Sequence, residues 1–132
     1  VDQYMTTHLF TVHEDELVDL VAFLMDRKQI RHVLVEDDDH RLTGIVSYRS
    51  VLRLITRDDD EAKGRRPVRD IMERDPITVS PDTETLEAIR IMRDKRVPCL
   101  PVVKEDRLVG IVSERDFMPI AYQLLEDRLG KD

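Results

Sequence analysis

Two seven-residue segments carry side chains suited to binding a small anionic ligand. Residues 110–116 read Gly-Ile-Val-Ser-Glu-Arg-Asp and join an apolar segment to a segment with helical character. Residues 44–50 read Gly-Ile-Val-Ser-Tyr-Arg-Ser. A hydroxyl, a guanidinium and a carboxylate at a helix start suit a ligand with both a phosphate and a sugar diol. The earlier copy lacks the carboxylate, because Ser50 stands where the later copy has Asp116.

Each side chain of the later copy has a possible role. The Asp116 carboxylate can accept hydrogen bonds from both hydroxyls of a ribose. Ser113 and the free amides behind it would face a phosphate, Arg115 adds a cation, and Gly110 allows close backbone approach. The alternative is purely structural: Ser113 caps the helix, Asp116 is an acid favoured by the helix dipole, and Gly110 marks a bend. The spacing alone leaves both interpretations open.

Composition limits the class of protein. The 132 residues suit one modest domain, and 21 basic against 28 acidic side chains give a net charge of −7. This balance disfavours binding to a nucleic-acid backbone. Cys99 is the single cysteine, so no internal disulfide forms, and no apolar run reaches membrane-spanning length. We expect a soluble, cytoplasmic protein without membrane insertion, although a soluble segment cut from a membrane protein would look the same.

The chain contains an internal repeat. Residues 1–5 match residues 68–72 at an offset of 67, and after an insertion at His40 the offset becomes 66. Residues 41–49 and 107–115 are identical at seven of nine positions. We therefore predict a first copy at 1–56, a charged linker at 57–67 and a second copy at 68–127.

Both copies predict the same β-α-β-β-α order. Short strands near 11–12 and 78–79 precede helices with apolar stripes, and Ser80-Pro81 indicates a helix start. Paired strands follow at 33–35 with 42–46 and at 100–103 with 108–112, and second helices span 47–56 and 113–127. One such copy cannot bury both sheet faces alone. We therefore expect an α+β fold with two βαββα repeats packed sheet to sheet about a pseudo-two-fold axis.

These features together resemble the tandem CBS-domain pair, or Bateman module. The resemblance depends on the repeat, on Asp70-Ile71-Met72, on the Pro98–Val102 strand and on the turn pattern Gly-h-h-Ser-x-x-Asp, and it covers essentially the whole chain. It implies a regulatory module and not an enzyme. It also implies an adenine ligand (AMP, ADP, ATP, S-adenosylmethionine or NAD), a homodimer, and a regulated enzyme or transporter domain as partner.

The resemblance also implies two ligand sites, each completed by the other repeat. The main site would use Met5, Ile30, Arg31, His32, Gly110, Ile111, Ser113, Arg115 and Asp116, with Ile30 and Ile111 flanking the adenine. The second site would use Ile45, Ser47, Arg49, Ser50, Met72, Val97 and Pro98. Because the Ser50 hydroxyl cannot replace a bidentate carboxylate, we expect this site to be empty or about tenfold weaker.

Other functions fit less well. His8, His13, His32 and His40 show no metal-ligand spacing, and residues 37–39 are best interpreted as a solvated acidic turn. The sequence shows neither a nucleophile paired with a base nor a phosphate-binding lysine loop, so it does not indicate an enzyme. A structural dimerisation module without a ligand is the alternative. The last helix is apolar on more than one side, which favours a homodimer through Phe117, Met118, Ile120, Tyr122, Leu124 and Leu125.

Overall fold

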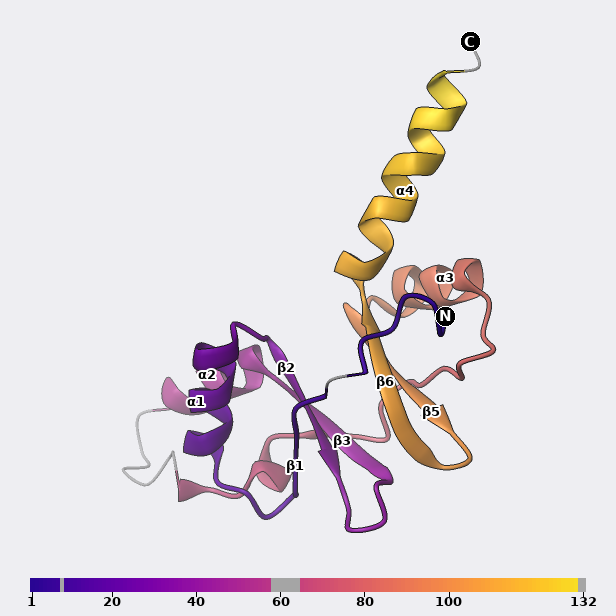
Figure 1. Ribbon diagram of the computed structural model, residues 1–132. Helices are drawn as coiled ribbons and strands as arrows, with labels where there is room; N and C mark the ends of the chain where they lie inside the picture. Colours follow the sequence, from indigo (N-terminus) through magenta and orange to yellow (C-terminus); the bar gives the residue numbers. More distant parts are fainter. Residues whose placement is uncertain (8, 58–64, 131–132) are drawn as a thin grey trace. The chain divides into compact units, whose positions relative to one another are not determined.

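The computed structural model describes residues 1–7, 9–57 and 65–130 (Figure 1). His8 and most of the predicted linker lie outside the described residues. The elements in chain order are β1 (Thr11–Val12), α1 (Val18–Lys28), β2 (His32–Glu36), β3 (Leu42–Ser47), α2 (Tyr48–Ile55), the 3₁₀ helix η2 (Val68–Asp70), β4 (Glu73–Arg74), α3 (Thr85–Lys95), β5 (Cys99–Lys104), β6 (Arg107–Ser113) and α4 (Glu114–Leu129).

The chain divides into two compact units whose segments alternate along the sequence. Unit 1 contains Val1–His8, Ile77–Glu105 and Val109–Asp132, and unit 2 contains Leu9–Pro76 and Asp106–Leu108. Each unit therefore includes the opening segment of the other sequence copy. In unit 2 this segment is tied down by backbone hydrogen bonds from Val18 N–H to Arg66 O (2.9 Å) and from Val68 N–H to Glu16 O (2.7 Å).

Unit 2 contains a four-stranded sheet in the order β1-β2-β3-β4. The β1–β2 pair is parallel, and the other two pairs are antiparallel. Helices α1 and α2 lie beside one another and cover this sheet (Figure 1). Branched side chains interlock well on a pleated surface, and those with no exposed surface in this core are Val21, Val33, Val35, Val46 and Val68.

Unit 1 repeats this arrangement with a sheet of two strands. β5 pairs with β6, and isolated bridges add Val79 beside Val102 in parallel and Thr6 beside Ile111 in antiparallel. The order of segments is thus the same as in unit 2, with the opening segment of the chain next to β6. Leu100, Val102 and Val112 lie fully buried in its core.

The first helix of each copy buries the predicted apolar stripe. Val18, Val21 and Met25 are buried on α1, and Ala88 and Met92 are buried on α3. Both helices end on a residue in the left-handed conformation, Gln29 with φ 53° and Arg96 with φ 56°.

The predicted helix start at Ser80-Pro81 is wrong. Helix α3 begins at Thr85, with Glu84 in the capping position. Ser80 instead closes a turn: its carbonyl accepts the Thr83 N–H (3.1 Å), and its own N–H donates to Thr83 Oγ1 (3.0 Å). A serine followed by proline favours a turn as well as a helix cap, because proline fixes only its own φ angle.

Helix α4 extends well beyond the core of unit 1. Phe117 is its one buried residue among those that the structure describes, and Tyr4 packs edge-on against its ring at 6.3 Å. From residue 121 to residue 130 every residue is exposed. Figure 1 shows the helix leaving the end of β6 and running away from α3.

Candidate functional site

The turn between β6 and α4 holds Asp116 in a fixed orientation. Ser113 ends β6 and occupies the capping position of α4. Its backbone N–H donates to Asp116 Oδ2 at 2.7 Å, and its hydroxyl donates to the same oxygen at 3.3 Å. Asp116 is half-buried, and Oδ1 takes part in no hydrogen bond among the described residues. The carboxylate is therefore held by one oxygen and offers the other.

The opening segment of the chain lies against this turn's strand. Thr6 N–H donates to Ile111 O at 2.8 Å, and Ile111 N–H donates to Thr6 O at 3.1 Å. A Cβ added to Gly110 would lie 2.7 Å from Met5 Sδ and 3.1 Å from Thr6 O, so the glycine permits this close approach. Unit 1 therefore contains six residues of the predicted main site: Met5, Gly110, Ile111, Ser113, Arg115 and Asp116.

Unit 2 builds the same turn without the acid. The Ser47 hydroxyl accepts the Ser50 N–H at 3.2 Å and caps α2, and the two serine hydroxyls lie 3.2 Å apart. Met72 approaches Gly44 as Met5 approaches Gly110, with Sδ 2.7 Å from an added Cβ. The predicted residues of the second site that share this unit are Ile45, Ser47, Arg49, Ser50 and Met72.

The residues just before β2 and β5 lie next to the turn of their own copy. Arg31 O accepts the Tyr48 N–H at 2.8 Å, and Pro98 O accepts the Glu114 N–H at 3.1 Å. Ile30, Arg31 and His32 thus belong to unit 2, and Val97 and Pro98 belong to unit 1. The expectation that each of these segments completes the site of the other copy stays a prediction.

The Arg31 side chain has a partner that the sequence analysis missed. Its guanidinium lies over the Tyr48 ring, 5.3 Å from the ring centre. This cation–π contact stabilises the position of the guanidinium over the face of the ring. The 17-residue separation of the two residues gives no signal for it; the hairpin between β2 and β3 brings them together.

His32 is half-buried in register with Ser47 across the β2–β3 ladder. Burial, followed by the nearby positive charge of Arg31, lowers the pKa of His32 below its usual value of 6.5. The imidazole is therefore neutral at neutral pH.

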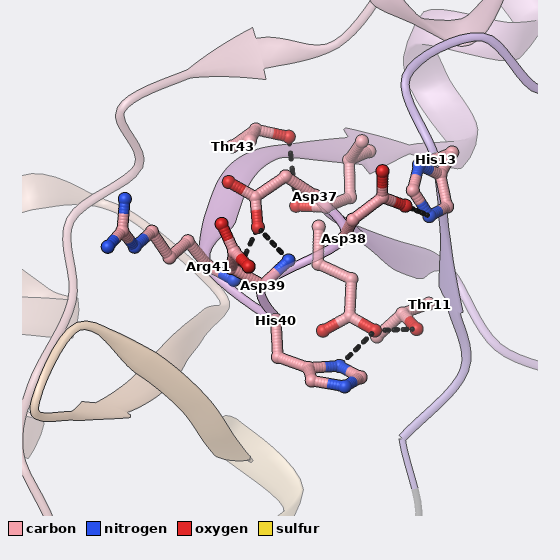
Figure 2. Close-up of polar contacts among 10 residues, drawn as sticks. Thr11, His13, Asp37, Asp38, Asp39, His40, Arg41 and Thr43 are labelled. Atoms are coloured by element: carbon pink, nitrogen blue, oxygen red, sulfur yellow. Dashed lines mark hydrogen bonds and ion pairs between the residues drawn. The ribbon is translucent and has the colours of Figure 1, made fainter.

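Two carboxylates of the acidic turn between β2 and β3, those of Asp37 and Asp38, have polar partners (Figure 2). Asp37 Oδ1 accepts the N–H groups of Arg41 and Asp39, each at 2.9 Å, and these bonds lower the pKa of Asp37. Asp38 pairs with His13 at 3.2 Å, and His40 lies 3.4 Å from a Glu36 oxygen. Over residues 1–7, 9–57 and 65–130, no group of three His, Cys, Asp or Glu side chains is arranged to hold a metal ion. The predicted acidic turn is hydrogen-bonded and exposed.

Among the described residues, no helix combines the length and the apolar character needed to cross a bilayer.

The two sequence copies, each with the same kind of turn, match one known family. The family model of the CBS domain matches this sequence twice, at residues 1–57 and at residues 68–121. The chain therefore belongs to the CBS-domain family, and its fold is the mixed α+β fold of a CBS pair, as the resemblance implied.

Relatives of this chain include proteins of similar and of much greater length. A CBS domain-containing protein of Dictyostelium discoideum is 32% identical over 96% of this chain and 93% of its own. An inosine-5'-monophosphate dehydrogenase of Methanocaldococcus jannaschii is 31% identical over 89% of this chain, which spans only 22% of that enzyme.

Solved structures show the same fold over nearly the full length. The AcuB protein of Vibrio cholerae has a TM-score of 0.85 and 32% identity, covering 100% of this chain and 96% of that chain. CBSX2, crystallised in complex with AMP, has a TM-score of 0.83 and 26% identity, covering 92% and 95%.

Proposed function

We propose that this chain is a regulatory module that binds an adenine nucleotide or adenosyl ligand at the Ser113–Asp116 turn. One observation carries the proposal: the half-buried Asp116 carboxylate is held through Oδ2 and leaves Oδ1 available. The AMP complex of the similar protein CBSX2 supports AMP as the first ligand to test. ATP, S-adenosylmethionine and NAD are the other candidates.

The side chains of the turn divide the ligand between them. Asp116 would accept the hydrogen bonds of the ribose hydroxyls, and a charged acceptor strengthens each bond. Ser113 and the exposed Arg115 would face the phosphate at the start of α4. The half-buried side chains of Met5 and Ile111, which belong to the same unit, would flank the base.

The module would act by shifting the populations of two conformations, because a ligand with different affinities for two states favours one of them. A partner domain or protein would read the change. The match to a small part of a dehydrogenase supports a role as an accessory regulatory part of a larger enzyme. In this proposal the module itself carries out no chemical step.

A structural dimerisation module is the second candidate, and helix α4 favours it. Its exposed residues Met118, Tyr122, Leu125 and Leu129 follow a 4-3-4 spacing, which is that of a coiled-coil seam. Their side chains are 60–74% exposed, which is unusual for apolar residues this close together. We therefore propose that α4 of a second copy covers this stripe and forms a homodimer.

Titration calorimetry with AMP, ATP, S-adenosylmethionine and NAD tests the ligand proposal. We expect saturable heat with at least one of them, close to one ligand per chain, and a loss of affinity of about tenfold or more in Asp116→Asn. Ser50→Ala, at the equivalent position of the other turn, serves as the matched control and should leave that affinity unchanged. No heat with any ligand, together with a dimeric mass by light scattering, would favour the structural module. Hydrolysis of an added nucleotide would contradict the non-catalytic assignment.

A further inference from the structure

Helix α4 carries an apolar seam with two different ends. Met118, Tyr122, Leu125 and Leu129 are 60–74% exposed and recur at the 4-3-4 spacing of one helix side. Arg115 stands three residues before Met118, so it continues the same side by one further position, and it is exposed. Among the described residues Arg115 forms no ion pair. The seam therefore begins with a cation and ends with a leucine.

We propose that two copies of the chain pair through this seam with their α4 helices antiparallel. The proposal rests on the α4 homodimer of the proposed function, which it deepens by assigning the orientation and the contacts, and it requires no ligand. In this register Met118 lies against Leu129 of the second copy, and Tyr122 lies against Leu125 of the second copy. The two-fold symmetry repeats both contacts with the copies exchanged, so one seam covers itself.

The sizes of the seam side chains favour the antiparallel arrangement. In a parallel pair each seam residue meets its own counterpart, so one layer holds two tyrosine rings and the next holds two leucines. In the antiparallel pair every layer combines a leucine with either a methionine or a tyrosine. Facing positions that alternate larger and smaller side chains interlock without voids. The Tyr122 hydroxyl can also extend past the smaller leucine and stay in water.

The charge at the start of the seam favours the same arrangement. In a parallel pair Arg115 would face Arg115 of the second copy, and packed helices lie only about 8–10 Å apart. Two guanidinium groups at that separation repel each other. In the antiparallel pair Arg115 instead lies just beyond Leu129 of the second copy, where that helix ends. The partly negative carbonyl groups of a helix end attract a cation, so the repulsion is replaced by an attraction.

The part of α4 that bears the seam is accessible to a second helix. From residue 121 to residue 130 every residue is exposed, and Figure 1 shows α4 running away from α3. The seam spans about 16 Å from Met118 to Leu129, at about 1.5 Å per residue. An antiparallel partner helix runs along this whole length. It places the Ser113–Asp116 turns of the two copies at opposite ends of the seam, because each turn stands at the start of its α4.

Two exposed leucines of unit 1 test the location of the interface. We expect sedimentation equilibrium of the whole chain to give a dimeric mass at micromolar concentration. Leu125→Glu places a charge in the centre of the seam on both copies and should weaken the dimer by about a hundredfold or more. Leu86→Glu is the matched control, because Leu86 is 57% exposed on α3 and lies outside the seam. It should leave the dissociation constant within about twofold, and circular dichroism reports the fold of both variants.

Cysteine cross-linking tests the orientation. Met118→Cys and Leu129→Cys are prepared as separate full-length chains, one of them with a longer affinity tag, and are oxidised alone and as a mixture. A disulfide needs Cα atoms within about 7 Å. In the antiparallel dimer positions 118 and 129 face each other, whereas two equal positions lie about 16 Å apart along the seam. We therefore expect cross-linked chains in the mixture only, and none in either variant alone or in the wild type, whose Cys99 is buried.

Three results would overturn the proposal. Cross-links within either variant alone, formed as fast as in the mixture, would show a parallel pair, which rejects the orientation and keeps the homodimer. Equal weakening by Leu125→Glu and Leu86→Glu would place the interface outside the seam. A monomeric wild type would reject the homodimer of the proposed function as well, while calorimetry with the adenine ligands reports separately on the ligand proposal.

Discussion

Replacement of Asp116 should separate its structural role from its ligand role. In the free protein the carboxylate accepts the Ser113 N–H at 2.7 Å and the Ser113 hydroxyl at 3.3 Å. Asp116→Ala removes both bonds and an acid from the first turn of α4. Hydrogen bonds to charged groups contribute about 1.5–3 kcal/mol when well formed, and a first-turn acid contributes about 0.3–1 kcal/mol. Because Asp116 is only half-buried, we expect Asp116→Ala to lower the free energy of unfolding by about 1–2 kcal/mol.

Asp116→Asn should behave differently in the two roles. Its amide oxygen can still accept the Ser113 N–H, so the loss of stability should be smaller, about 0.5–1 kcal/mol. Its nitrogen cannot accept a second hydroxyl, so both variants should lose the ribose contact. The free energy of unfolding should therefore be highest in the wild type, lower in Asp116→Asn and lowest in Asp116→Ala. The adenine ligand should bind both variants equally weakly.

Urea unfolding followed by circular dichroism measures the stability of the ligand-free proteins. For Asp116→Ala, the expected loss of about 1–2 kcal/mol corresponds to a fall in Tm of roughly 3–8 °C. Ser50→Ala is the matched control, because it removes only a hydroxyl contact with Ser47. If Asp116→Ala unfolds at the same urea concentration as the wild type, the carboxylate does not cap α4. If Asp116→Asn keeps full affinity for the ligand, the negative charge is not used in binding.

Two further changes test packing and protonation. Gly110→Ala should lower the free energy of unfolding by about 1–3 kcal/mol, because the added Cβ would lie 2.7 Å from Met5 Sδ. Met5→Ala in the same chain should restore part of this loss. If urea unfolding shows no loss of stability in Gly110→Ala, the close contact is contradicted. The lowered pKa of His32 means that between this pKa and 6.5 the unfolded chain binds more protons, so the wild type should lose stability as pH falls through that window. His32→Gln should flatten the dependence of Tm on pH there, and parallel curves would show that His32 carries none of it.

The repeat made most of the elements predictable. Most strands and helices are predictable because the two apolar patterns agree at an offset of 67, which becomes 66 after His40, and the stripe of Val18, Val21 and Met25 is buried as expected. A local sequence signal that occurs in only one copy gave a wrong prediction. Ser80-Pro81 looked like a helix start, yet it forms a turn, because both structures begin with the same two residues.

The residue pattern alone does not predict the contacts that reach across the sequence, and only the resemblance groups Met5 with Gly110 and Ile111. Nothing in the pattern shows that Thr6 pairs with Ile111, although Met5 and Met72 stand at equivalent positions of the two opening segments and offered a signal. The bond from Ser113 N–H to Asp116 is not among the predictions, which give Ser113 and Asp116 two alternative roles: a cap with a dipole-favoured acid, or a ligand site. The structure shows that these alternatives are compatible, since the cap uses a single carboxylate oxygen.

Calorimetry of AMP against 2'-deoxy-AMP, on the wild type and on Asp116→Asn, tests the central claim most directly. If Asp116 binds the ribose diol, the wild type should prefer AMP by about tenfold, or roughly 1.4 kcal/mol, and Asp116→Asn should show no preference. Equal affinity of the wild type for both nucleotides, or the same preference in the variant, would contradict the assignment of Asp116 as the ribose-binding residue.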